Sequence, residues 1–193
     1  MAMALLTACG SLLEPSGDLS DAMDVELSGY VAAAARPTPQ TLCDAEPSGT
    51  GPTPPALSGD LGEPAAAFYE TAPATLEAYA WRASAEAART AGTGTAPESD
   101  EEAARQFVDD ATTAAAACGF DLSTDVQSVE PWSGSGWEGV RIHRVVSGEQ
   151  QTDRRLVSAG DVVLLVIMRA DTDDPAILAP ADDFLEAVAE NLD

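Results

Sequence analysis

The sequence predicts an α+β fold, with a single antiparallel β-sheet packed with helices and closed by a C-terminal helix. Three observations favour this class. Four consecutive strand-like segments lie in the last third of the chain, an alanine-rich segment with a helix start signal precedes them, and an amphipathic segment follows them. The chain has 193 residues, of which 45% are hydrophobic, and this suits one domain with a buried core.

The first strand is predicted at residues 75–82, where the side chains alternate in character. Leu76 and Ala78 would face one side of the sheet, while Tyr79 and Trp81 would face the other.

Two helices are predicted next. Ser84 is placed to cap the start of a short helix. A longer helix begins at Ser99, which has Glu102 three residues later, the spacing of a capping box. Its apolar stripe, which runs down to Cys118, consists of Ala103, Phe107, Ala111, Ala114 and Ala115.

An antiparallel meander follows, with strands at 125–132 and 136–148 and two more within 153–170, which turn at 159–161. The run 162–168 is apolar at every position, which is typical of a central strand covered on both faces. In the second strand, Val140 and Ile142 alternate with Arg141 and His143. This alternation predicts one buried and one polar face.

The chain closes with a helix whose first turn is acidic, as the helix dipole favours. Phe184, Leu185 and Val188 recur at helical spacing and would face the sheet.

The segment Leu6-Thr7-Ala8-Cys9, followed by Gly10, resembles a bacterial lipobox, in which the cysteine carries the lipid. Residues 1–8 contain no Arg or Lys and are too few for a complete leader, so we expect them to be the remnant of a lipoprotein signal peptide. Residues 9–24 would form the lipidated cysteine and a flexible tether, and 25–193 the extracytoplasmic domain. The alternative is a soluble protein in which Cys9 follows small residues by chance.

With Cys9 bound to lipid, Cys43 and Cys118 remain. Outside the cytoplasm two such thiols ordinarily pair, so we expect a Cys43–Cys118 disulfide that would hold a Pro-rich loop. Two unpaired buried thiols are the alternative.

Charge excludes some partners. All nine basic residues are Arg, and with 33 Asp and Glu the formal charge is −24. Binding to nucleic acid depends on basic residues that neutralise phosphates, so we expect no nucleic-acid partner. The sequence also contains no phosphate-binding loop and no dinucleotide fingerprint, and we expect no cofactor and no metal. The one histidine, His143, lies between two arginines and lacks a nucleophile motif, so no catalytic residue is assigned.

One stretch, 131–170, departs from the acidic background because it has five Arg against four acids. With two tryptophans nearby it could form a cationic, aromatic-edged groove for an anionic or carbohydrate ligand. The candidate ligand-binding residues are Trp132, Trp137, Arg141, His143, Arg144, Arg154 and Arg155. In the alternative interpretation, the tryptophans cap the sheet and the arginines pair with the abundant acids.

The order of elements resembles the extracellular sensor domain of PknH-type actinobacterial Ser/Thr kinases, which also occurs alone on lipoproteins. The similarity covers roughly residues 43–192 and rests on the Tyr79-x-Trp81 strand, the helix that ends in Cys118, the strand from Trp137, the apolar strand 162–168 and the final helix. The resemblance implies a non-catalytic domain that binds an extracytoplasmic ligand. Together with the lipid anchor expected at Cys9, it predicts a sensor-like lipoprotein on the extracytoplasmic side of the cell membrane, with an unidentified ligand or protein as partner. An envelope lipoprotein with a structural or protein-interaction role is the alternative, and a hydrolase is the third candidate.

Overall fold

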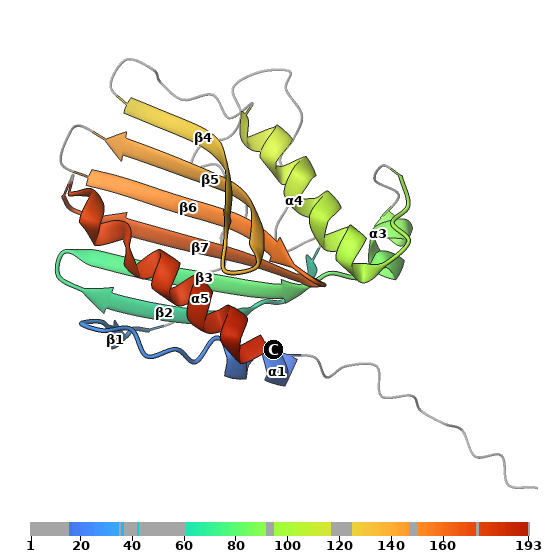
Figure 1. The fold of residues 1–193 in the computed structure, drawn as a ribbon, viewed down its shortest axis with the longest axis horizontal. Coiled ribbons are helices and arrows are strands. Elements are labelled where there is room, and N and C mark those ends of the chain that lie inside the picture. Colours follow the sequence, from blue (N-terminus) through green and yellow to red (C-terminus); the bar gives the residue numbers. More distant parts are fainter. Residues whose placement is uncertain are drawn as a thin grey trace, which may run out of the picture.

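A computed structural model of the chain describes residues 16–34, 36, 42, 61–91, 95–116, 125–146, 150–172 and 174–192. They form one seven-stranded antiparallel sheet in the order β1-β2-β3-β7-β6-β5-β4, with helices packed on it (Figure 1). The predicted α+β class, including the closing C-terminal helix, is confirmed.

The strands are β1 (Val31–Ala32), β2 (Ala65–Thr71), β3 (Ala74–Arg82), β4 (Asp125–Gly134), β5 (Trp137–Val146), β6 (Gln150–Ala159) and β7 (Val162–Ala170). The helices are α1 (Ser16–Ala22), α3 (Ala85–Ala91), α4 (Asp100–Ala116), the 3-10 turn η1 (Pro175–Leu178) and α5 (Pro180–Leu192).

The sheet has a core on each face because β3 and β7 are apolar on both sides. Leu76 and Ala78 pack with α5 and α1, whereas Tyr79 and Trp81 pack with α3 and α4 on the opposite side. We call these two sides the α5 face and the α4 face. In Figure 1, α5 crosses in front of β7, β3 and β2. The predicted central strand 162–168 is buried throughout, and it lies between β3 and β6 in the middle of the sheet.

The helix starts follow from their caps. The Ser84 hydroxyl accepts a hydrogen bond from the Ala87 N–H at 3.3 Å, as expected for an N-cap. The Ser99 hydroxyl likewise accepts from the Glu102 N–H at 3.1 Å. The other half of the predicted capping box differs, because the Glu102 carboxylate accepts from the Glu98 N–H and not from that of Ser99.

The predicted boundary between tether and domain at residue 25 is too late. Helix α1 begins at Ser16, and Leu19 and Met23 belong to the core on the α5 face. The hydroxyl of Tyr69 in β2 fastens this segment, since it donates to the Met23 carbonyl and accepts from the Val25 N–H, both at 3.1 Å. Residues 16–24 are therefore part of the domain. Residues 1–15, with Cys9, lie outside the described residues, as do Cys43 and Cys118.

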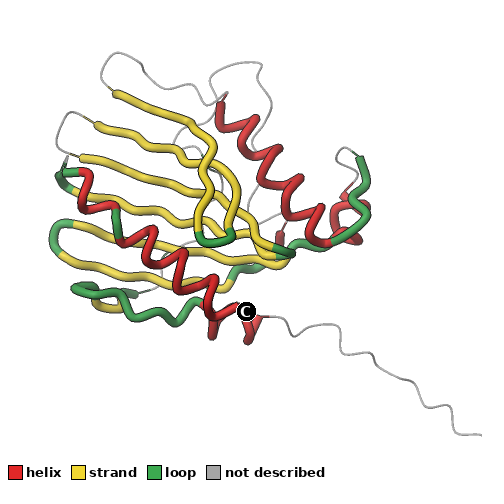
Figure 2. The backbone as a smooth tube through the Cα atoms, in the orientation of Figure 1, coloured by secondary structure: helices red, strands yellow, loops and turns green. Residues whose placement is uncertain are grey.

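Gly139 lets the β4–β5 hairpin bend. A Cβ atom at this position would lie 2.1 Å from the Leu156 carbonyl oxygen of β6, so only glycine permits the approach. Beyond the bend the hairpin curls toward α5 (Figure 2). There the Trp137 indole Nε1–H donates to the Leu185 carbonyl at 2.9 Å and holds the hairpin against α5.

Candidate functional site

The seven candidate ligand-binding residues do not share one surface. Successive residues of a strand point to opposite faces, and the register between β4, β5 and β6 divides the set. On the α5 face lie Trp132, Trp137, Arg141, His143 and Arg155, and on the α4 face lie Arg144 and Arg154. The structure therefore does not form the single groove that the sequence predicts.

Trp137 belongs to the core. It is 1% exposed and its indole N–H is bound to α5, so nearly all of the ring is buried in the protein. This position fits the alternative interpretation, in which a tryptophan caps the sheet.

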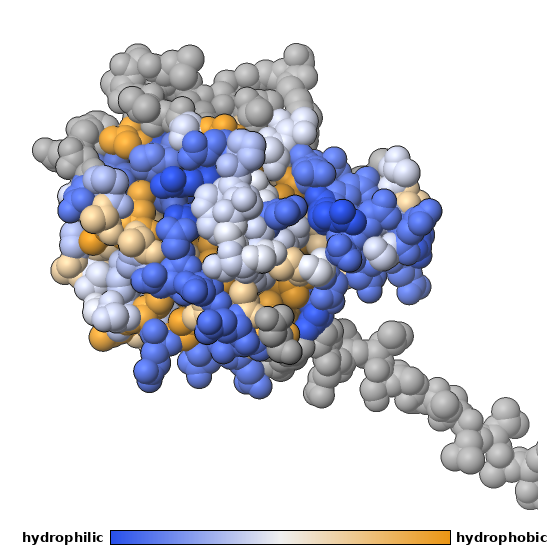
Figure 3. Space-filling view, in the orientation of Figure 1, coloured by the Kyte–Doolittle hydropathy of each residue, from blue (hydrophilic) through white to orange (hydrophobic). Residues whose placement is uncertain are grey.

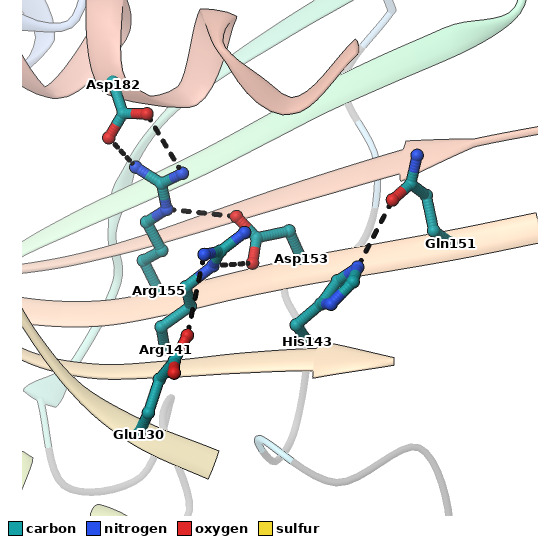
Figure 4. A network of polar contacts seen from close by, with 7 residues as sticks. All are labelled: Glu130, Arg141, His143, Gln151, Asp153, Arg155 and Asp182. Carbon is teal, nitrogen blue, oxygen red and sulfur yellow. Dashed lines mark hydrogen bonds and ion pairs between the residues drawn. The ribbon is translucent and has the colours of Figure 1, made fainter. Parts of the chain in front are cut away.

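Asp153 organises the remaining arginines of the α5 face (Figure 4). Its side chain is fully buried and accepts from Arg141 Nε at 2.6 Å and from Arg155 Nε at 3.0 Å. Arg141 also pairs with Glu130 of β4 at 3.5 Å, and Arg155 pairs with Asp182 of α5. Because a buried carboxylate needs paired charges and hydrogen bonds, Asp153 and its two arginines hold one another in place.

The charges of this network leave no cationic groove. Two guanidinium groups, Arg141 and Arg155, meet three carboxylates. The Arg155 guanidinium also lies 5.0 Å from the Trp132 ring centroid and covers that side of the ring. The expectation of a cationic site for an anionic ligand is therefore wrong for this face, and the alternative, in which arginines pair with acids, is what the structure contains.

His143 lies beside this network, opposite Ser128 of β4 and Asp153 of β6 in the sheet register, and its side chain contacts Gln151. One ring nitrogen, Nε2, is 3.2 Å from Gln151 Oε1, and Gln151 in turn donates to the Asp174 carbonyl at 2.8 Å. Asp174 caps η1, where its carboxylate accepts from the Ala176 N–H. The histidine thus joins a chain of contacts that fixes the start of η1 to the sheet.

On the α4 face, Arg154 contacts a residue that is far away in the sequence. Arg154 is 7% exposed, and its Nη1 donates to the Leu42 carbonyl at 2.8 Å, which holds Leu42 against the sheet. Arg144 lies farther along the same face, opposite Thr152 of β6.

A second buried acid lies on the α4 face, on β3. Glu77 pairs with Arg36 at 2.9 Å and with Arg169 of β7, and it accepts from the Tyr79 hydroxyl at 3.3 Å. Burial, together with the negative charge of Glu77, raises the pKa of Tyr79. The phenol is therefore held as a hydrogen-bond donor.

A hollow of about 470 Å³ opens between α4 and the β4–β5 hairpin. Its lining consists of Arg105, Val108 and Asp109 from α4, together with Pro131, Trp132, Ser133, Glu138, Gly139 and Ser158 from the strands. It lies where the hairpin, bent at Gly139, turns toward α5 and away from α4. Among the seven predicted residues, Trp132 is the one in this lining.

Two regular patterns meet at the hollow. Arg105, Val108 and Asp109 are spaced i, i+3 and i+4 and so form one face of α4. Opposite them, Ser133, Glu138 and Ser158 are direct neighbours in the sheet register and form a polar row across β4, β5 and β6. The two-residue turn Ser135-Gly136 could have indicated the pairing of Ser133 with Glu138. The approach of α4 is a tertiary contact that carries no sequence signal.

No protein-family model and no curated protein matches the chain.

In the described part of the chain, no group of three or more His, Cys, Asp or Glu side chains is placed to hold a metal ion. No helix there combines the length and the apolar character that crossing a membrane requires.

Proposed function

We propose that the chain is a membrane-anchored extracytoplasmic lipoprotein whose folded part is a non-catalytic, sensor-like binding domain. The ligand is a small polar molecule that enters the hollow between α4 and the β4–β5 hairpin. The observation that carries the binding role is the hollow itself. Its volume of about 470 Å³ lies within the range of roughly 300–1,000 Å³ typical of small-molecule sites.

The lining supports binding rather than packing. A helix that packs on a sheet normally meets apolar side chains, as α4 does through Ala104, Ala111 and Ala115. At the hollow the same helix instead faces the row Ser133, Glu138 and Ser158, which brings hydroxyl and carboxylate groups toward the space between the two elements. Such convergent polar groups can orient a ligand.

Trp132 connects the hollow with the other face of the sheet. It lines the hollow and contacts Arg155, which in turn pairs with Asp182 at the start of α5. A ligand that contacts the indole would thus be linked, through Arg155, to the ion pair that fastens α5 to the sheet. This connection suits a domain that reports occupancy, as the resemblance to the kinase sensor domains implies.

The anchor remains an inference from the lipobox. Because α1 begins at Ser16, the tether after Cys9 is shorter than predicted, and seven residue steps span no more than about 25 Å. The domain would therefore lie close to the membrane surface. Detection of a diacylglycerol adduct on Cys9 by mass spectrometry, after expression in the native host, tests this part, and an unmodified thiol in the membrane fraction would refute it.

The alternative of a protein-interaction role has less support. Among the described residues Val31 is the one exposed large hydrophobic side chain. On the face shown in Figure 3, hydrophilic side chains predominate and hydrophobic ones form small scattered patches. Protein-docking sites usually present larger contiguous apolar patches.

Tryptophan fluorescence tests the binding role. Trp81 and Trp137 are 1% exposed, whereas Trp132 lines the hollow, so a bound ligand should change mainly the emission of Trp132. The purified chain is titrated with cell-wall fragments and lipid headgroups. We expect one class to give a saturable change that is lost in Trp132→Phe. No response to any class, with the protein shown to be folded, would overturn the proposed binding site.

A further inference from the structure

We infer that the ligand of the hollow is a small, hydroxylated organic cation, of which an amino sugar is the simplest example. This inference rests on the proposed binding function and adds the chemical class. It differs from the anionic ligand that the arginines suggest in the sequence.

The charged groups of the lining come from two separate elements. Asp109 extends from α4 and Glu138 from β5, so two carboxylates approach the hollow from opposite walls. Within the described residues neither carboxylate forms an ion pair with a protein cation. An amine or guanidine group between them would form charge-assisted hydrogen bonds.

The one cation of the lining, Arg105, is partly neutralised. Its guanidinium lies 3.8 Å from the Glu101 carboxylate one turn earlier in α4. The hollow therefore has a negative balance, and it lies in a chain whose formal charge is −24. Both the local and the overall field attract cations and repel anions.

Neutral polar groups complete the surface. Ser133 and Ser158 flank Glu138 in the polar row, and Ser158, which is only 5% exposed, is part of the lining. Val108 and Pro131 add apolar walls. Hydroxyl groups on the ligand can donate to and accept from the serines, while its carbon skeleton packs against the apolar walls.

Three sugars of similar shape and different charge test the class. Glucosamine, glucose and glucuronate are titrated into the full chain at about pH 6, where the amine is protonated, with the emission of Trp132 as readout. We expect affinity to decrease from glucosamine to glucose to glucuronate. Raising the salt concentration should weaken the binding of glucosamine and leave that of glucose unchanged.

Two substitutions in the hollow should act in opposite directions. Glu138→Gln should weaken glucosamine binding about two- to fivefold, because one exposed charge interaction is lost. Arg105→Gln should strengthen it by a similar factor, because a repelling charge is removed. In each variant the change in affinity should be larger for glucosamine than for uncharged glucose. The matched control is Glu186→Gln, which removes an exposed acid from α5, away from the hollow.

The outcomes separate this inference from the function on which it rests. Equal affinity for the three sugars, or preference for glucuronate, would overturn the cationic class and leave the binding site standing. No binding of glucosamine up to about 50 mM would also overturn the inference. In that case the titration with cell-wall fragments and lipid headgroups decides independently whether the hollow binds a ligand at all. A loss of glucosamine binding in Arg105→Gln would likewise refute the charge argument.

Discussion

Replacing Asp153 by Asn should destabilise the domain far more than the loss of an ordinary surface charge would. The carboxylate is fully buried and accepts from two guanidinium groups, those of Arg141 and Arg155. An Asn side chain keeps one oxygen acceptor but presents an N–H₂ group to the second donor. One arginine is therefore left facing another donor, and the negative charge between the two cations is lost.

The magnitude follows from burial. Breaking a buried ion pair by removing one partner costs about 3–5 kcal/mol, because the other charge stays desolvated. The Arg155 side chain is 3% exposed, but it keeps Asp182, and Arg141 is 27% exposed and keeps Glu130. We therefore expect Asp153→Asn to lower the free energy of unfolding by about 2–4 kcal/mol.

The matched control is Asp161→Asn. This substitution also breaks an Arg–Asp pair, here between β3 and the β6–β7 turn, in which Arg82 donates at 2.8 Å to each carboxylate oxygen. The partners are 27% and 37% exposed, so the expected loss is about 0–1 kcal/mol.

Urea unfolding near neutral pH and room temperature, followed by far-UV circular dichroism, measures both variants. A loss below about 1 kcal/mol for Asp153→Asn, equal to that of the control, would show that the network is hydrated in solution and would refute the reasoning.

Three further outcomes are expected. Gly139→Ala should lower the free energy of unfolding by about 3 kcal/mol or more, because the new Cβ would lie 2.1 Å from a backbone oxygen of β6. Gly136→Ala is the control, since Gly136 has a φ of 81° but lies in open space, and it should lower the same free energy by about 1 kcal/mol. Equal losses in the two variants would contradict the role of Gly139 at the bend. Burial raises the pKa of all three tyrosines, including Tyr79, so ultraviolet titration should show no native phenolate near the ordinary value of about 10. The tyrosines of the unfolded chain then lose their protons at a lower pH than those of the folded protein, so the free energy of unfolding should fall as the pH rises above about 10. Titration of the tyrosines of the folded protein near pH 10 would contradict this prediction. Intact mass after alkylation should show labels on Cys43 and Cys118 only after reduction, and labelling of the native secreted protein would refute the disulfide.

Local patterns were enough to predict most of the fold. The alternation in β3, the unbroken apolar run of β7 and the stripe of α5 all depend on side-chain spacing, which the chain carries in every window. The strand β2 was missed because its small residues, Ala65, Ala66 and Ala67, have weak strand preference. Helix α1 was missed because Leu19 and Met23 form too short a stripe to distinguish it from a tether.

The candidate site was predicted less well. The sequence pointed to the arginines by their number, but whether an arginine is open to a ligand depends on the acids that reach it from other elements. Asp182 comes from α5 and Glu130 from β4, and both meet arginines on neighbouring strands. Of the seven candidate residues, Trp132 is the one that lines the hollow.

By itself, the sequence determined the α+β class, the central strand, the helix caps and the alternation of faces, because each depends on contacts between residues close in the chain. The tertiary structure decided which charges are neutralised and where a hollow opens. These features arise from distant segments: the bend at Gly139 over β6, the approach of α4 to the row that contains Glu138, and the contact of Asp182 with Arg155. Such contacts leave no periodicity in the sequence, because they depend on how already formed elements pack against one another.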